Sequence, residues 1–146
     1  MRLPERFEDG LGYLIHHLLY AFRQGFSREC ARLGINVTLE EMAVLVLLSE
    51  CNGLSHTELA DKLAKDKAVI TRILAKLNAK GLVSRRTDRK DRRIVRAYLS
   101  DNGRRAFDQL LPLLQDFLRR ALQGVSQRDF DTTRRVLRGI IENLRV

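Results

Sequence analysis

The chain has 146 residues, a formal net charge of +9 and 45% hydrophobic residues, which suits one domain or one domain with an appended dimerisation element. No apolar run reaches the roughly 18 residues of a membrane span, and the longest is Met42–Leu48. The start, MRLPERFEDG, lacks the apolar stretch of a signal peptide, and two cysteines are too few for a disulfide framework. We therefore expect a cytoplasmic protein that makes no membrane contact.

Two helices are predicted in the first fifty residues. Apolar side chains recur at helical spacing over about residues 10–33, and Gly34 is a plausible C-terminal cap. The stretch Thr38–Glu41, TLEE, is typical of a capping box and predicts the start of a second helix. Asn52-Gly53 is expected to end it.

A shorter helix and a fourth helix follow. Ser55–Glu58, SHTE, is a second capping box and predicts a short helix. The fourth helix is predicted over about residues 67–80, with Gly81 closing it. Its apolar side chains, which we expect to face the core, are Val69, Ile70, Ile73, Leu74 and Leu77.

The pattern then changes to one that favours strands. Leu82-Val83 and residues 94–99 are β-prone, and a charged stretch with its centre at about 88–92 separates them. We expect a two-stranded hairpin with its tip at these central residues. Three helices followed by a hairpin are typical of a winged helix-turn-helix.

The chain is predicted to end in two further helices. The longer runs from Asp101 to about Gln123, with a bend at Pro112, and the last begins at Ser126. The predicted fold class is therefore mainly α with a small β-hairpin wing. We expect a division into an N-terminal dimerisation helix, a winged helix-turn-helix domain and C-terminal dimerisation helices, over residues 1–36, 37–100 and 101–146.

The positive charge is confined to one segment. Residues 66–105 hold thirteen Lys/Arg and four Asp/Glu, a net of +9, while the rest of the chain holds fourteen of each sign. A basic segment on an otherwise neutral body indicates a surface that binds a polyanion, although a run of charge is more often only a solvated face. Double-stranded DNA is the partner we expect.

The second helix of a helix-turn-helix presents its first residues to base edges in the major groove. Here the outward face of that helix combines small, hydroxyl and cationic side chains, a chemistry that suits a groove: Lys67, Ala68, Thr71, Arg72 and Lys76. The alternative is an ordinary surface helix.

The hairpin extends this surface, because an arginine-lined tip can reach a minor groove. Its candidate DNA-binding residues are Arg86, Arg89, Lys90, Arg92 and Arg93. We expect Asp91 to hydrogen-bond an arginine and fix its direction, since a carboxylate and a guanidinium form a planar pair. The alternative is that Asp91 only shapes the turn.

Residues 58–103, ELADKLAKDKAVITRILAKLNAKGLVSRRTDRKDRRIVRAYLSDNG, resemble the core of MarR-type transcription regulators. The resemblance is carried by the recognition helix, by GLV before the wing, by Asp91-x-Arg93 and by YLSDNG after it. It implies a homodimer on a pseudo-palindromic operator, with Arg93 in a minor groove, Asp91 orienting it, and the terminal helices forming the dimer interface. The apolar face of the helix over 101–123 is also wider than one core contact needs, which indicates a dimer independently.

The resemblance further implies a small phenolic or lipophilic effector. Candidate ligand-binding residues, in a pocket between the first two helices and the fifth, are His16, His17, Tyr20 and Met42; the alternative is that they bind nothing. Cys30 and Cys51 are candidates for a thiol switch, with Cys51 expected to be buried. No metal site and no cofactor are expected, because the adjacent His16 and His17 point to different sides of a helix.

The first functional hypothesis is a sequence-specific DNA-binding regulator, most simply a ligand-responsive repressor. The alternatives are a non-specific architectural nucleic-acid binder and a winged-helix module that binds an acidic protein surface. An enzyme is not expected, and no catalytic residue is proposed, because the chain lacks a phosphate loop, metal-ligand spacing and a nucleophile motif.

Overall fold

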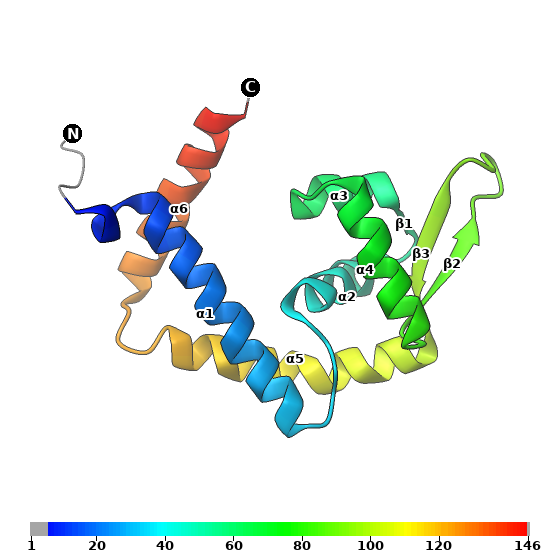
Figure 1. Cartoon of the computed structure of the whole chain (residues 1–146), viewed down its shortest axis with the longest axis horizontal. Helices are drawn as coiled ribbons and strands as arrows, with labels where there is room; N and C mark the ends of the chain where they lie inside the picture. Colours follow the sequence, from blue (N-terminus) through cyan, green and yellow to red (C-terminus); the bar gives the residue numbers. More distant parts are fainter. Residues whose placement is uncertain (1–5, 146) are drawn as a thin grey trace. The chain divides into compact units, whose positions relative to one another are not determined.

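The computed structural model describes residues 6–145, and apart from η1 and β1 its helices and strands follow the order expected (Figure 1). The helices are η1 (Phe7–Asp9, a short 3-10 helix), α1 (Leu11–Arg32), α2 (Leu39–Glu50), α3 (His56–Leu63), α4 (Lys67–Ala79), α5 (Asp101–Ala121) and α6 (Gln127–Leu144). The strands are β1 (Leu54–Ser55), β2 (Val83–Thr87) and β3 (Val95–Leu99). The chain forms two compact units, Met1–Leu114 and Gln115–Val146.

The two predicted capping boxes are confirmed. The hydroxyl of Thr38 accepts from the backbone N–H of Glu41 at 3.1 Å, and the Glu41 carboxylate accepts from the backbone N–H of Thr38 at 2.9 Å. Ser55 and Glu58 exchange the same two bonds at 3.2 and 2.7 Å. Each box satisfies N–H groups that the first turn of its helix leaves without partners.

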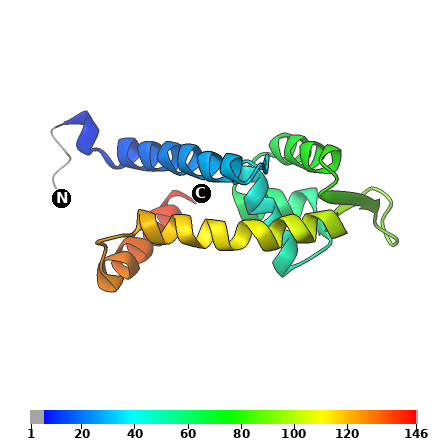
Figure 2. The same cartoon turned by 90° about the horizontal axis from the view of Figure 1, so that it is seen from below.

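The sheet has one more strand than the sequence predicted. β3 lies between β1 and β2, and both pairings are antiparallel. β1 was not expected; its two residues, Leu54 and Ser55, pair with Ala97 and Arg96 immediately before α3 begins. The wing is therefore attached to the helix-turn-helix by hydrogen bonds between strands. The β2–β3 hairpin extends from the helical part of the first unit (Figure 2).

The core of the first unit is built on α2 and α4. α2 is buried at Met42, Val44, Leu45 and Leu48, and α4 is buried at Ile70, Ile73, Leu74 and Leu77. Of the side chains predicted to face the core from α4, only Val69 is half-buried rather than buried. Because the apolar face of α4 is held in this core, its opposite face is fixed toward solvent.

The start of α5 is packed tightly against the wing. Gly103 is buried, and a Cβ atom on it would lie 1.9 Å from the carbonyl oxygen of Leu82. The helix then continues through Pro112 to Ala121, and Gly124 follows at φ +82°. Among the described residues, no helix is both long and apolar enough to cross a membrane.

Candidate nucleic-acid interface

α4 presents the side chains that the sequence predicted for a groove. The turn before it places Ala64 at φ +49°, and α4 then begins at Lys67. Its outward side is exposed at all five predicted positions: Lys67, Ala68, Thr71, Arg72 and Lys76. These residues recur at helical spacing, so they form one face that combines small, hydroxyl and cationic groups.

Thr71 on this face is held by a contact that the sequence did not reveal. Its hydroxyl donates to the backbone carbonyl of Lys67 at 2.9 Å, so it can accept a hydrogen bond from Nδ1 of His56, 3.2 Å away. Nε2 of His56 is buried and has no partner among the described residues. Burial, together with the nearby Arg85, lowers the pKa of His56. His56 is therefore neutral and joins the start of α3 to α4.

The wing tip is closed by main-chain contacts to Asp88. Oδ1 of Asp88 accepts from the backbone N–H groups of Lys90 and Asp91, at 2.7 and 3.0 Å. The backbone N–H of Asp88 donates to the carbonyl of Ile94 at 2.8 Å. Asp88 thus helps to set the shape of the turn between β2 and β3.

Asp91 does not make the side-chain pair that we expected. Its carboxylate accepts from the backbone N–H of Arg93 at 3.0 Å, and within residues 6–145 it has no bond to a guanidinium. The contact shapes the turn and so directs Arg93 only through its main chain. The carboxylate that does pair with an arginine in the wing belongs to Asp88.

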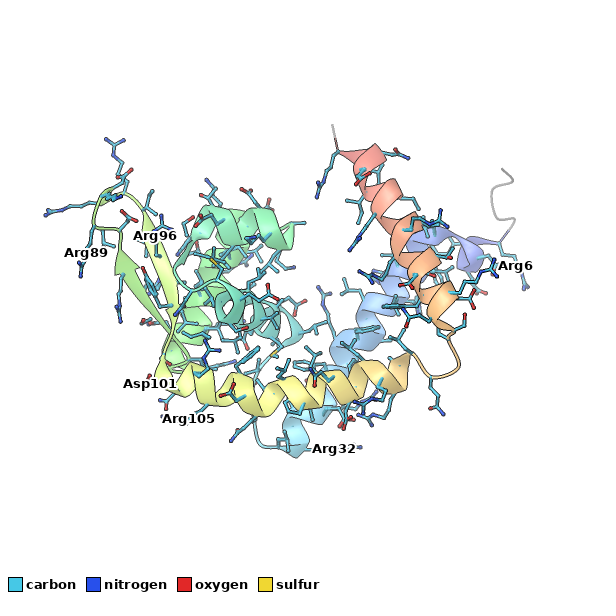
Figure 3. All side chains as sticks on the ribbon, turned by 180° about the vertical axis from the view of Figure 1, so that it is seen from behind. Arg6, Arg32, Arg89, Arg96, Asp101 and Arg105 are labelled. Carbon is cyan, nitrogen blue, oxygen red and sulfur yellow. The ribbon has the colours of Figure 1, made fainter. Side chains whose placement is uncertain are left out.

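The cations of the wing tip are exposed and close in the chain. In the part of the chain that the structure describes, no hydrogen bond or ion pair engages the side chains of four of them: Arg89, Lys90, Arg92 and Arg93. Arg86 differs, because its guanidinium lies over the ring of Tyr98, 5.1 Å from the centroid. Among the described residues, the tip therefore presents cationic side chains that no ion pair engages, and Figure 3 labels one of them, Arg89.

Arg96 is not one of these exposed cations. Its Nε donates to Oδ2 of Asp88 at 2.6 Å, and its Nη1 donates to the carbonyl of Gly53 at 2.9 Å. Nη1 also lies 3.3 Å from Oε2 of Glu58. The pKa of the Asp88 carboxyl falls to about 2, first because Arg96 donates to it and then because the Asp91 and Lys90 N–H groups do.

The effector candidates differ in burial. Met42 is buried in the core, whereas Tyr20 is 58% exposed and His16 and His17 are exposed on α1. The rings of His16 and His17 lie edge to face, 6.2 Å apart. The described residues contain no cluster of His, Cys, Asp or Glu suited to a metal.

The cysteines also differ from expectation. Cys51 is exposed, so the prediction that it is buried was wrong; it lies after the last turn of α2. Cys30 is buried, and burial followed by the charge of Glu29 raises the pKa of its thiol. A raised pKa disfavours the reactive thiolate at Cys30.

Comparison with known proteins identifies this fold. Residues 37–95 match the model of the MarR family. Over these residues the chain has the sequence of a MarR-family domain. The match begins just before the capping box of α2 and ends at the first residue of β3, so it covers the helix-turn-helix and most of the wing.

Relatives and solved structures agree with the MarR assignment. An uncharacterised HTH-type transcriptional regulator of Bacillus subtilis, YdgJ, is 30% identical over 109 residues, and the transcriptional repressor MprA of Escherichia coli is 29% identical over 112 residues. These matches cover 75% and 76% of the chain but only 64% and 63% of the relatives. Proteins of this family are transcription regulators, in agreement with the expectation that the chain is not an enzyme.

Two solved structures show the same fold over nearly the whole chain. A probable transcriptional regulator from Pseudomonas aeruginosa has a TM-score of 0.84 and 26% identity, covering 92% of this chain and 99% of its own. MepR of S. aureus, solved as a complex with DNA, has a TM-score of 0.82 and 18% identity, covering 96% and 100%. The winged helix-turn-helix prediction is thus confirmed.

Proposed function

We propose that this protein is a sequence-specific DNA-binding transcription regulator of the MarR family. The observation that carries the proposal is the pairing of two exposed cationic surfaces on neighbouring elements: the outward face of α4 and the tip of the β2–β3 wing. Both lie in the segment that holds the entire net charge of the chain. The DNA complex solved for MepR, a protein of the same fold, supports DNA as the polyanion.

The two surfaces would take different roles on a duplex. α4 is the element that would enter the major groove, where Ala68 permits close approach and Thr71 and Arg72 can meet base edges or phosphates. The wing tip would follow the backbone into the adjacent minor groove, with Arg93 as the inserted side chain. Lys67, Lys76, Arg86, Arg89, Lys90 and Arg92 would supply phosphate contacts.

We further propose that the protein acts as a homodimer. Exposed apolar side chains lie on α1 and on α6 rather than on α5, whose large apolar side chains are all buried or half-buried. Five large side chains of α1 are between 43% and 57% exposed: Leu11, Leu14, Ile15, Leu18 and Leu19. A helix with such a face needs a partner surface.

The dimer has a direct test. When tagged and untagged chains are co-expressed, the untagged chain should co-purify, and replacing Leu14 and Leu18 with glutamate should abolish that capture. The matched control replaces Arg28, another exposed residue of α1, with glutamate. Absence of co-purification with the wild-type chain would contradict the dimer.

Repression in response to a small effector is the regulatory mode that we propose. MprA, named as a transcriptional repressor, supports the sign of regulation. Because His16, His17 and Tyr20 are exposed on α1 in the single chain, a phenolic or lipophilic ligand bound by them would need further surface, which a second copy of the chain could supply. A promoter–reporter fusion that stays on when the protein is supplied would contradict repression.

The DNA-binding function is tested by selection from a random duplex library. The enriched DNA should contain a pseudo-palindrome whose half-sites repeat at roughly 10-bp multiples, since a two-fold dimer presents two α4 helices. Enrichment without any shared motif would indicate an architectural binder. Failure to retain any duplex would favour the protein-interaction module.

A further inference from the structure

We propose that Arg96 is the positioning residue of the wing: it holds the tip loop against α3, so that the tip cations meet DNA in one fixed place. This inference rests on the proposed function, and it names a residue that the sequence pattern did not single out. Arg96 lies on β3, where its register partners are Arg86 on β2 and Ser55 on β1. It is therefore in the central strand of the sheet, between the hairpin and the strand that leads into α3.

One end of the link is Asp88. Its two carboxylate oxygens are divided between two tasks. Oδ1 accepts from the backbone N–H groups of Lys90 and Asp91 and closes the tip. Oδ2 accepts from Nε of Arg96 at 2.6 Å. The shape of the tip and its attachment to Arg96 are thus set by the same side chain, which has 17% of its surface exposed.

The other end of the link is the helix-turn-helix. Nη1 of Arg96 donates to the carbonyl of Gly53 at 2.9 Å and lies 3.3 Å from Oε2 of Glu58. Gly53 and Glu58 flank β1, and Glu58 is also the carboxylate that caps α3. The guanidinium can hold all three partners because its donors form a rigid, planar fork, a geometry that an ammonium group lacks.

Arg96 is poorly suited to contact DNA directly. Its side chain is 29% exposed and lies between two carboxylates, and the pKa of its guanidinium is raised, first by the bond to Asp88. Arg89 and Arg93, in contrast, carry uncompensated charge at the tip. Figure 3 labels Arg89 and Arg96 on the same hairpin. The half-buried Arg96 therefore positions the tip, and the exposed cations of the tip bind DNA.

The consequence is preorganisation of the wing. A hairpin tip that is free to move must lose that freedom when its cations bind phosphates, and the loss weakens binding. Arg96 ties the tip to α3, which is packed on α4, before DNA arrives. Removing it should weaken only those DNA contacts that the wing makes.

The test is a set of double-variant binding measurements on the DNA selected above. Arg96→Met should weaken binding about tenfold, and Arg96→Lys less, because lysine can replace one bond but not the fork. Adding Arg93→Ala should then cost little in the Arg96→Met background, although it costs about tenfold in the wild type. Lys76→Ala on α4 is the matched control, and its effect should be equal in both backgrounds.

A second measurement needs no DNA. In the full-length protein, ¹⁵N relaxation should show that the backbone amides of residues 89–92 are ordered in the wild type and mobile in Arg96→Met, while residues 70–77 of α4 are unchanged. Unchanged order at the tip, or a full effect of Arg93→Ala in the Arg96→Met background, would overturn the inference. A wild type that binds no DNA yet has an Arg96-dependent tip would overturn the proposed function alone.

Discussion

The imidazole of His56 and the hydroxyl of Thr71 are joined by a hydrogen bond of 3.2 Å, which connects the first residue of α3 to the exposed face of α4. Since the Thr71 hydroxyl already donates to the carbonyl of Lys67, the hydrogen between the two side chains belongs to Nδ1 of His56. The other ring nitrogen is buried and has no partner within residues 6–145. The position therefore favours a neutral imidazole.

Stability should fall on mild acidification because of His56. Its pKa is lowered in the folded protein, while an unfolded histidine titrates near about 6.5. The unfolded state then binds more protons just below that pH, so the free energy of unfolding decreases as the pH falls through about 6.5 and levels off below the folded pKa. Urea unfolding at a series of pH values should show this component in the wild type and not in His56→Gln.

The matched control is His16→Gln, which alters an exposed histidine of α1. Its pH profile should keep the component that His56→Gln removes. Parallel profiles for the wild type and His56→Gln would show that His56 takes up its proton as readily in the folded chain as in the unfolded one.

Asp88 should titrate at an unusually low pH. With a folded pKa of about 2, it contributes to stability above the ordinary carboxyl range, and the contribution is lost as the pH falls from there toward about 2. Because the bond from Arg96 is the largest cause, Arg96→Met should move the midpoint of the Asp88 carboxyl carbon, followed by NMR, back toward its ordinary value.

Arg86→Met provides the comparison, since Arg86 is opposite Arg96 in the ladder but contacts Tyr98. It should leave the Asp88 midpoint where it is. A shift of equal size in both variants would mean that general positive charge, rather than the Arg96 bond, lowers the pKa.

Gly103→Ala should be strongly destabilising. The added Cβ would lie 1.9 Å from the backbone oxygen of Leu82, a contact that only a shift of the backbone can relieve. We expect a loss of about 3 kcal/mol or more in the free energy of unfolding. Gly12→Ala is the control in α1, where nothing lies within 4 Å of the new methyl group, and it should be neutral or stabilising by up to ~1 kcal/mol. Equal effects of the two substitutions would contradict the close packing of α5 on the wing.

The ion pair of Glu41 with Lys80 should matter for stability. Nζ of Lys80 lies 2.7 Å from Oε2 of Glu41, whose side chain is only 2% exposed. The same Nζ also donates to the backbone carbonyl of Asn36. Lys80→Met leaves a buried carboxylate without its cation and should cost about 2 kcal/mol. The double variant with Glu41→Gln should recover part of that loss.

An exposed pair offers the contrast. Arg119→Met removes the cation from Asp116, where both side chains are more than half exposed, and should change stability by less than about 0.5 kcal/mol. A comparable loss in both single variants would indicate that burial does not distinguish the two pairs.

Local signals predicted most of the fold. Capping boxes at Thr38 and Ser55 and the glycine after α4 act within a few residues, so they can be recognised without tertiary information. β1 could not be predicted in this way, because two residues form a strand only through their pairing with β3. Cys51 was predicted to be buried because an apolar run precedes it, but it lies at the C-terminal end of α2, where it is exposed to solvent.

The candidate site was likewise predicted where local signals suffice and missed where tertiary contacts decide. The outward face of α4 follows from its apolar periodicity, and the exposed residues of the wing tip follow from their charge. Which aspartate of the tip pairs with an arginine depends on strand register, which places Arg96 beside Asp88 and leaves Asp91 to the main chain. His56 lies inside a capping box, and nothing local to it indicates a partner fifteen residues away.

The central claim is tested most directly by fluorescence anisotropy of the full-length chain on the selected DNA and on a scrambled duplex of the same length, across a salt series. We predict tight binding to the selected DNA, much weaker binding to the scrambled one at every salt concentration, and affinities that fall steeply as salt rises. Equal affinity for both duplexes at all salt concentrations, or no binding to either, would contradict a sequence-specific regulator.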